Sequence, residues 1–422
     1  MPLEDIEKPE RYRPGGYHPL SVGDRLNGRY DVVHKLGFGT YSTIWLARDA
    51  NLKKYVAIKI AIAEADSPES HILDTLAPAP SEPSDEGQPG AEALIPQVLD
   101  TFSLDGPNGR HTCLVTEPGI MSLAEAKDAS YTRLFTMPVA RAIAAQVIQA
   151  VAFLHRQGVV HADLHAGNIM FRLSKSVDEL SPADIYQRYG PPNIEPFVRS
   201  DGKPLPDGVP SHGVVPIWLG KESERVALSE ARVFVTDFGE SFRPSSTTAA
   251  AAAAAAANQR LYSHTPAVLT PPETYFHEPL SFPSDIWTLA CTIWEGLGQR
   301  PLFEGFNPSN DWMIKEHVDA LGKLPSDWWQ AWDARERWFT EEAKRRAAGA
   351  GRTLGTRFVD SIQDPRQGSA MEGIGEAEKS ALLAMVKGML AFRPDERLTA
   401  MEVLGSGWMR RWGLPALAKV AA

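Results

Sequence analysis

Four short motifs in a fixed order constrain this chain more than any other feature. His161–Asn168 (HADLHAGN) places an Asp and an Asn five residues apart, directly after an amphipathic helix pattern. Asp237–Gly239 (DFG) follows downstream, while the glycine-rich turn at Gly37–Gly39 and Val56–Lys59 (VAIK) precede it. Each motif alone is weak evidence. In this order they predict transfer of a phosphoryl group from ATP to a hydroxyl, rather than a chance set of polar clusters.

Composition predicts a soluble globular protein. Of the 422 residues, 43% are hydrophobic and 23% are charged, and the length allows more than one domain-sized unit. Two cysteines, Cys113 and Cys291, cannot form a disulfide framework, which favours a reducing compartment. The charged N-terminus does not read as a secretory signal, and we expect no apolar stretch long enough to cross a bilayer. A net charge of −10 argues against nonspecific nucleic-acid binding and suits a basic partner.

Local patterns predict β-structure early in the chain and helices later. We expect residues 1–20 to form an irregular arm and Tyr30–Ile60 to form strands around the glycine turn. Residues 77–90 read as an exposed loop, and Thr112–Glu117 reads as a buried strand followed by a hinge. Pro138–Gly158 is the clearest helix, with Pro in the first turn and Gly just past the end.

Three further segments stand out. Leu173–Ala231 is rich in Pro and Gly and is too long for a structureless loop, so we read it as an insertion that is partly ordered or functional. The alanine run Ala249–Ala257 reads as a flexible loop expansion, since nine residues are too few for a stable isolated helix. Ser284–Leu297 reads as a buried helix, and we expect the tryptophans of residues 328–338 to be core anchors.

The N-terminal motifs have the chemistry of phosphate binding. The glycines of Gly37-Phe38-Gly39 let the backbone approach phosphate oxygens, although Ser42 stands where such loops often have a third glycine. Lys59 ends an apolar strand and is read as a buried cation that grips the α- and β-phosphates, with a snorkelling surface lysine as the alternative. Glu69 is the candidate acid that holds Lys59, and Glu64 is the second choice.

The central motifs supply a base and metal ligands. Asp163 can accept the proton of an incoming hydroxyl, a role worth roughly 10²–10⁴ in rate. Asn168 and Asp237 offer the oxygen ligands that Mg²⁺ prefers. His165 occupies the position from which a cation reaches the transferring phosphate, whereas His161 reads as a structural hydrogen-bonding residue.

These residues resemble the signature of the eukaryotic protein kinases. Pro271-Pro272-Glu273 is similar to the family's Ala-Pro-Glu, Asp285-Ile286-Trp287 to its Asp-x-Trp helix start, and Arg397 to the late Arg that pairs with that Glu. The arm Tyr12–Pro19 (YRPGGYHP), Ser42–Leu46 (STIWL) and Leu321–Pro325 (LGKLP) further resemble the SR-protein kinases, in particular small fungal-type members.

The resemblance implies an α+β, bilobal fold, with a small β-rich lobe carrying one helix, a larger helical lobe and ATP between them. The implied organisation is an arm at 1–29, a small lobe at 30–117 and a large lobe at 118–422. The large lobe would contain the insertion 174–231 and an activation segment at 237–273. The resemblance also implies a set of nucleotide-binding residues: Leu36, Gly37, Gly39, Ser42, Ala57, Lys59, Glu69, Thr116 as gatekeeper, and Glu117 and Gly119 through their backbones. It implies catalysis by Asp163, Lys59 and His165, with Asn168 and Asp237 as Mg²⁺ ligands.

The resemblance also implies the substrates, which are serines in Arg/Ser-rich, often splicing-related, proteins. We expect a cytoplasmic or nuclear monomer that contacts neither nucleic acid directly nor membrane. Asp311, Glu316 and Asp319 lie where the family's acidic residues form a docking groove, and ordinary solvated helix charges are the alternative.

Two positions depart from the family pattern and leave other functions open. The usual Arg before the catalytic Asp is Ala162, and the usual Lys two residues after it is His165. A pseudokinase scaffold is one alternative, chiefly because of His165. The other is a small-molecule phosphotransferase of the aminoglycoside or choline type, whose His-x-Asp-x-His-x-Gly-Asn pattern is similar; Pro271–Glu273 and Arg397 argue against it.

Overall fold

The protein consists of two compact units, each with its own core. The computed structural model describes residues 6–65, 69–76, 91–199, 201–244, 261–346 and 351–420. The first unit takes the described residues within Met1–Ala77, Pro96–Met121 and Arg172–Gly220, and the second takes those within Pro78–Ile95, Ser122–Phe171 and Lys221–Ala422. The sequence segments 77–90 and Ala249–Ala257, for which loops are predicted, lie outside the described residues.

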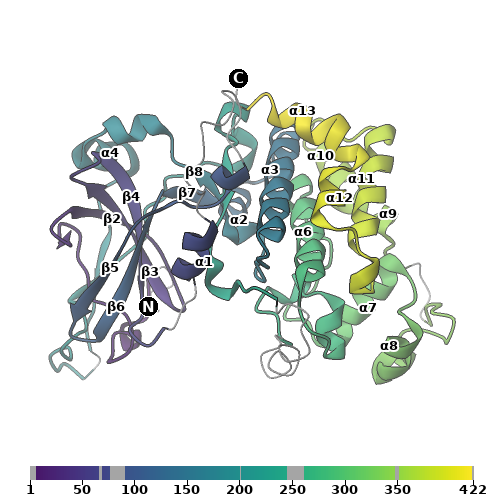
Figure 1. Cartoon of the computed structure of the whole chain (residues 1–422), viewed down its shortest axis with the longest axis horizontal. Coiled ribbons are helices and arrows are strands. Elements are labelled where there is room, and N and C mark those ends of the chain that lie inside the picture. Colours follow the sequence, from purple (N-terminus) through teal and green to yellow (C-terminus); the bar gives the residue numbers. More distant parts are fainter. Residues whose placement is uncertain are drawn as a thin grey trace. The chain divides into compact units, whose positions relative to one another are not determined.

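An antiparallel sheet of six strands is the centre of the first unit (Figure 1). Its order is β1-β2-β3-β4-β6-β5. The strands are β1 (Arg25–Leu26), β2 (Tyr30–Gly39), β3 (Ser42–Asp49), β4 (Lys54–Ala61), β5 (Val98–Gly106) and β6 (Gly109–Thr116). Trp45, Val56, Ile58 and Val115 are buried in the core of this sheet, so the predicted β-region of Tyr30–Ile60 is confirmed. Helix α1 (Glu69–Leu76) packs near β5 and buries Ile72 and Leu73.

Most of the predicted insertion belongs to the first unit, not to the large lobe to which the sequence assigns it. It folds into α4 (Pro182–Tyr189) and the hairpin β9 (Ile194–Pro196) and β10 (His212–Val214). Ile185, Ile217 and Leu219 share an apolar cluster with side chains of β2, β3 and β4. Tyr186 also donates a hydrogen bond of 2.7 Å to the carbonyl oxygen of Val33. Burial of these apolar side chains explains why the segment packs here.

Two long buried helices organise the second unit. Helices α3 (Met137–Arg156) and α6 (Phe282–Leu297) lie side by side (Figure 1) and match the predicted helices to within two residues at each end. Pro138 occupies the first turn of α3, and Gly158, with φ of +73°, follows its end as predicted. The sequence predicts no apolar stretch long enough to cross a bilayer, and this prediction is wrong. By length and composition alone, α3 is long and apolar enough to do so. However, 83% of its apolar window is buried inside the protein, as in a core helix.

Shorter elements complete the second unit. The chain passes from the first unit to the second within β7 (Gly119–Ser122), and β8 (Ile169–Arg172) pairs antiparallel with β11 (Val233–Val235). The remaining helices are α2 (Leu123–Asp128), α7 (Asn310–Leu321), α8 (Ser326–Ala331), α9 (Leu354–Phe358), α10 (Asp364–Gly368), α11 (Glu376–Met389), α12 (Ala400–Leu404) and α13 (Leu414–Leu417). Trp328, Trp329 and Trp332 are buried in one cluster with Trp338 against it, as predicted for core anchors.

Candidate active site

The glycine-rich turn connects β2 and β3 in the first unit. Gly39 pairs with Ser42, so Thr40 and Tyr41 form a two-residue turn, and the register shifts between Lys35 and Gly37. A Cβ atom added at Gly37 or Gly39 would meet no atom of the described residues within 4 Å. Packing against the part of the chain that the structure describes therefore does not require glycine at these positions. The open space suits the close approach of a ligand such as a phosphate.

Lys59 and Glu69 form the predicted ion pair. Lys59 lies on β4 opposite Ile44 of β3, and its Nζ is 2.7 Å from Oε2 of Glu69 at the start of α1. The Glu69 side chain is buried, and Lys59 keeps a quarter of its side chain exposed. Glu64, the second choice, instead pairs with Arg13 at 2.8 Å. The lysine is thus held on the strand next to the glycine turn.

The residues expected around an adenine ring lie within β4 and at the end of β6. Thr116 pairs in register with Ala57, which places these two positions side by side. The Thr116 hydroxyl donates a hydrogen bond of 3.3 Å to the carbonyl oxygen of Glu117. The Glu117 carboxylate forms an ion pair with Arg172, a contact that the sequence did not predict. Leu36 is partly buried in the neighbouring apolar cluster.

In the second unit, a buried carboxylate holds the catalytic segment by its backbone. Asp285, at the start of α6, accepts hydrogen bonds from the backbone N–H groups of His161 at 2.8 Å and Ala162 at 2.9 Å, and from His155 at 3.0 Å. Burial opposes ionisation, but the hydrogen bond from His155 and the backbone donors hold the pKa of Asp285 below its ordinary value. Ala162 adopts φ of +65°, and Asp285 fixes this uncommon conformation just before Asp163.

Asp163 and Asn168 face each other across a short 3₁₀ turn. Asn168 Nδ2 donates to the Asp163 carbonyl oxygen at 2.9 Å and to its Oδ2 at 3.3 Å. Because the amide nitrogen faces Asp163, the amide oxygen of Asn168 is directed away from it. Oδ1 of Asp163 is buried and has no hydrogen-bond partner among the described residues. This oxygen can therefore accept a hydrogen bond from a substrate hydroxyl and then take its proton.

His165 caps the same turn. Its Nδ1 accepts a hydrogen bond of 3.0 Å from the backbone N–H of Gly167, so the proton of the neutral ring is on Nε2. That Nε2 lies 3.7 Å from Oδ2 of Asp163, beyond hydrogen-bond distance. His165 therefore lies next to the candidate base, Asp163.

Asp237 follows β11 and has a left-handed conformation, with φ of +64° and ψ of 76°. The backbone N–H of Thr236 donates to the Asn168 carbonyl oxygen at 2.9 Å, which ties the two candidate metal-ligand segments together. Phe238 is buried, and its ring meets the His161 ring edge-to-face at 5.0 Å. His161 also contacts the Thr236 carbonyl oxygen through Nε2 at 3.1 Å, and its predicted structural role is consistent with these contacts.

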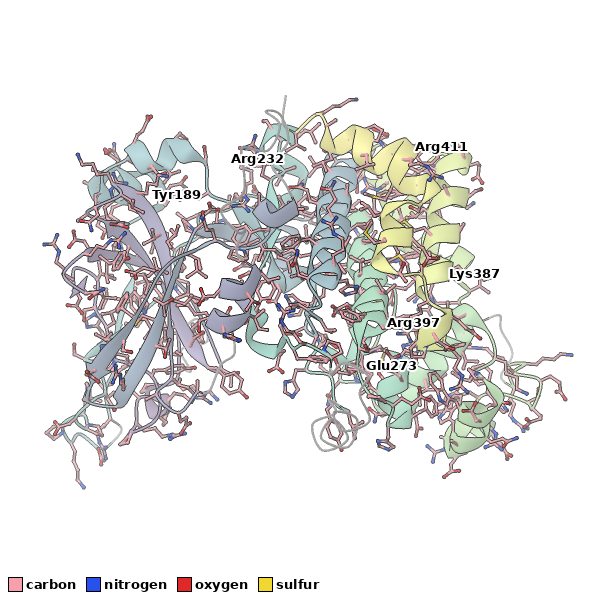
Figure 2. The ribbon with its side chains drawn as sticks, in the orientation of Figure 1. Tyr189, Arg232, Glu273, Lys387, Arg397 and Arg411 are labelled. Carbon is pink, nitrogen blue, oxygen red and sulfur yellow. The ribbon has the colours of Figure 1, made fainter. Side chains whose placement is uncertain are left out.

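The predicted late ion pair is present and fully buried. Arg397 donates to both carboxylate oxygens of Glu273, at 2.9 and 2.5 Å, and the two labelled side chains lie together in Figure 2. Ser284 donates to the same carboxylate at 2.8 Å, and the Arg397 guanidinium lies over the Trp287 ring at 5.1 Å. The bidentate pair ties the Pro271–Glu273 segment to Arg397, and the hydrogen bond from Ser284 ties it to α6.

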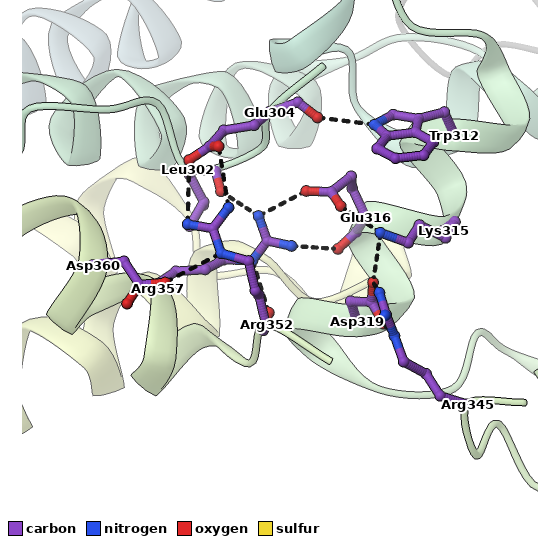
Figure 3. Close-up of polar contacts among 10 residues, drawn as sticks. All are labelled: Leu302, Glu304, Trp312, Lys315, Glu316, Asp319, Arg345, Arg352, Arg357 and Asp360. Atoms are coloured by element: carbon purple, nitrogen blue, oxygen red, sulfur yellow. Dashed lines mark hydrogen bonds and ion pairs between the residues drawn. The ribbon is translucent and has the colours of Figure 1, made fainter. Parts of the chain in front are cut away.

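The predicted acidic docking groove is not formed by the residues proposed for it. The side chains of Glu316 and Asp319 are only 6% and 1% exposed and have internal cationic partners (Figure 3). Lys315 lies 2.8 Å from Glu316 and 2.9 Å from Asp319, Arg357 lies 2.8 Å from Glu316, and Arg345 pairs with Asp319. Burial opposes ionisation, but these cations lower the pKa values of both carboxylates. The two acids are structural.

Asp311 alone of the three predicted acids faces a pocket. The pocket has a volume of about 740 Å³ and is lined by residues 275–278, α7, α8 and residues that follow α8. Its carboxylates are Glu278, Asp311, Asp327 and Asp333, and Arg337 also lines it. Arg393 pairs with Glu278 and Asp327, so it offsets two of these four carboxylates. Asp311 accepts a hydrogen bond of 2.9 Å from the indole of Trp332. The acidic character of the pocket therefore rests on Asp311 and Asp333.

Comparison with known proteins identifies the kind of domain that contains these residues. Residues 30–180 match the model of the protein kinase domain. A serine/threonine protein kinase of Aspergillus fumigatus is 24% identical over 413 residues, which cover 96% of this chain and 90% of that protein. The serine/threonine-protein kinase SRPK of Physarum polycephalum is 25% identical over 96% of this chain and 91% of its own length. SRSF protein kinase 3 of Homo sapiens is 35% identical over 169 residues, 40% of this chain and 30% of that protein.

The chain is a protein kinase with the predicted bilobal fold class. Three findings support this: the catalytic segment, the Lys59–Glu69 ion pair and the match to the protein kinase domain. The chain is similar to SR-protein kinases, which are serine/threonine kinases, both along its full length and over shorter matched regions. ATP-dependent phosphoryl transfer is the reaction of this class.

Proposed function

We propose that this chain phosphorylates serine in Arg/Ser-rich proteins, with ATP as donor and Mg²⁺ as the metal. The geometry of Asp163 carries the proposal, because its buried Oδ1 accepts no hydrogen bond from the described residues while Asn168 orients the rest of the carboxylate. The names of the relatives, which include SRSF protein kinase 3 and SRPK, support the substrate class.

In the proposed reaction, Asp163 accepts the proton as the serine Oγ attacks the γ-phosphorus. The new O–P bond forms as the bond to the β-phosphate oxygen breaks, so ADP leaves with the bridging oxygen. Lys59, held by Glu69, binds the α- and β-phosphates, and backbone groups of Gly37–Gly39 approach the phosphates. Glu117 and Gly119 contact the adenine ring through their backbones, and Thr116 is the gatekeeper.

The residues present fit a Mg²⁺ site built on protein and phosphate oxygens. Asn168 directs its amide oxygen away from Asp163, and Asp237 lies on a segment bonded to Asn168 through Thr236. Carboxylate and amide oxygens are the donors that Mg²⁺ takes in such sites, with phosphates supplying the rest. When bound, the metal neutralises charge on the β- and γ-phosphates.

His165 would take the part of the lysine found in related kinases. Because Gly167 N–H donates to Nδ1, Nε2 is the ring nitrogen that can donate a hydrogen bond beside Asp163. One ring N–H offers fewer hydrogen bonds to phosphoryl oxygens than the three donors of a lysine ammonium group. We therefore expect a working but slower catalyst, rather than an inactive scaffold.

Substrate choice would involve the acidic pocket around Asp311 and not the buried acids Glu316 and Asp319. Asp311 and Asp333, the two pocket carboxylates that Arg393 does not contact, suit an Arg-rich segment electrostatically. The activation segment, the monomeric state and a cytoplasmic or nuclear location stay predictions from the sequence.

The test measures transfer of the labelled γ-phosphate of ATP to three acceptors side by side: an Arg-Ser repeat peptide, a Lys-Ser repeat peptide and an aminoglycoside. We expect transfer mainly to the Arg-Ser peptide and only with Mg²⁺. Transfer to the aminoglycoside alone would make the chain a small-molecule phosphotransferase. Absence of transfer to all three, with ATP still bound, would make it a pseudokinase.

A further inference from the structure

The N-terminal arm, residues Ile6–Leu20, packs against the glycine-rich hairpin of its own unit. Ile6, Tyr12 and Tyr17 are buried in one apolar cluster with Ile62 at the end of β4 and Phe197 of the insertion. The backbone N–H groups of Ala63 and Glu64 also donate to the carbonyl oxygens of Gly16 and Gly15, at 3.1 and 2.9 Å. The arm is therefore an ordered part of the first unit.

Two side chains of the arm hold the turn of the hairpin by its backbone. The Tyr17 hydroxyl donates a hydrogen bond of 2.6 Å to the carbonyl oxygen of Gly39, and the Arg11 guanidinium donates to the carbonyl oxygen of Thr40. Burial raises the pKa of Tyr17 despite the nearby Arg11, so the hydroxyl keeps its proton and can donate at neutral pH. Arg11 also lies over the Tyr17 ring, at 5.4 Å.

A buried ion pair fixes the base of the same hairpin. Glu7 of the arm pairs with Lys35 of β2, and both side chains are almost fully buried. Tyr12 donates a hydrogen bond to the same carboxylate. Lys35 Nζ lies 5.2 Å from the centre of the Phe38 ring, which belongs to the glycine-rich turn. The arm thus contacts the hairpin at Lys35, Gly39 and Thr40.

The shape of the arm depends on its two adjacent glycines. Gly15 has φ of +83°, which favours glycine. A Cβ atom at Gly16 would lie 2.0 Å from the carbonyl oxygen of Arg11, which accepts a hydrogen bond of 3.0 Å from Tyr17 N–H. Gly15 and Gly16 therefore allow the tight turn that brings Arg11 and Tyr17 next to each other.

These contacts fix the direction of two amide groups. In a planar trans peptide the C=O and N–H groups point to opposite sides. Because Tyr17 and Arg11 hold the carbonyl oxygens of Gly39 and Thr40, the N–H groups of Thr40 and Tyr41 point away from the arm. We propose that the arm positions these amides for the nucleotide phosphates, with Tyr17 as the principal positioning residue. This inference rests on the proposed binding of ATP by the glycine-rich turn.

The test compares binding of ATP and adenosine to the full chain and to Y17F. Loss of one hydrogen bond should raise the Kd for ATP about fivefold. The Kd for adenosine, which lacks phosphates, should stay unchanged. Amide hydrogen exchange of the peptide that contains Thr40 and Tyr41 should become faster in Y17F. Y131F is the matched control, because Tyr131 is 99% exposed, and it should match the wild type in all three readouts.

The outcomes separate the two proposals. An equal ATP affinity of wild type and Y17F, or an equal loss of adenosine binding, would overturn the role of the arm while leaving the kinase proposal intact. Failure of the wild type to bind ATP would overturn the kinase proposal itself. R11K, which keeps the charge but changes the donor geometry, is the second variant and should raise the Kd for ATP without affecting adenosine.

Discussion

His317 should make the protein markedly less stable in mild acid. The residue lies on α7, and its imidazole is fully buried against the rings of Phe303 at 4.5 Å and Trp287 at 4.8 Å. Neither ring nitrogen has a hydrogen-bond partner among the described residues. Burial, together with the charges of Arg357 and Arg397, lowers the pKa of His317 from 6.5 to about 3.

The size of the effect follows from proton linkage. The unfolded chain binds a proton at this position below its ordinary pKa of 6.5, whereas the folded chain does not until about pH 3. Because the unfolded state binds more protons in this window, the free energy of unfolding falls as the pH falls. One proton is worth about 1.4 kcal/mol per pH unit, so His317 should cost the fold about 2 kcal/mol between about pH 7 and pH 5.

Urea unfolding of the wild type and H317L at a series of pH values measures this loss in the free energy of unfolding. Leucine has a similar volume and no ionisable group, so H317L should lose about 2 kcal/mol less than the wild type over the same interval. H317L should also be at least as stable as the wild type at neutral pH, since it removes two unpaired polar atoms. H71L, at an exposed position of α1, is the matched control and should follow the wild type. Parallel pH profiles of H317L and the wild type would refute the buried neutral state of His317.

Three further predictions concern the charges and the activation segment. D319N should lower the free energy of unfolding by about 3 kcal/mol in urea titrations, because it leaves Lys315 and Arg345 without their buried partner. The KM for an Arg-Ser peptide should stay within error of the wild-type value. A raised KM in a stable variant would restore the docking role of Asp319. Enzyme expressed in bacteria and treated with phosphatase should keep its full kcat, since Ala162 cannot bind a phosphate as an arginine does; recovery of activity only after phosphorylation within residues 237–273 would contradict this. D237A should weaken ATP binding at least tenfold in the presence of Mg²⁺ and much less in EDTA, measured by calorimetry, and equal weakening in both buffers would remove Asp237 from the metal site.

Local motifs could be predicted well because their chemistry is encoded in adjacent residues. The apolar run Val56–Ile58 predicted the position of the cation that follows it, Lys59 on β4. Glu69, at the start of a short amphipathic helix, was the predicted acidic partner, and it pairs with Lys59. The approximate boundaries of α3 followed from Pro138, which lies in its first turn, and from Gly158, which adopts a positive φ just past its end. Such signals depend on neighbouring residues only.

Contacts between distant segments could not be predicted in the same way. The helical period does not reveal that Arg345 and Arg357 neutralise Asp319 and Glu316, so the three acids of α7 read as exposed. The packing of residues 172–220 on the first unit depends on Ile185, Ile217 and Leu219 meeting side chains of three strands. The arm gave one signal, the pair Gly15-Gly16, but its contact with Gly39 needed the fold.

The reaction catalysed at Asp163 is the central claim, and single-turnover transfer of the labelled γ-phosphate to an Arg-Ser peptide tests it most directly. D163A should lower the rate of transfer about a thousandfold, because the base acts in the chemical step. The Kd for ATP, measured on the same preparations, should stay within about twofold, because Asp163 contributes to the chemical step and not to nucleotide binding. Transfer by D163A at the wild-type rate would contradict the assignment of the base and with it the mechanism.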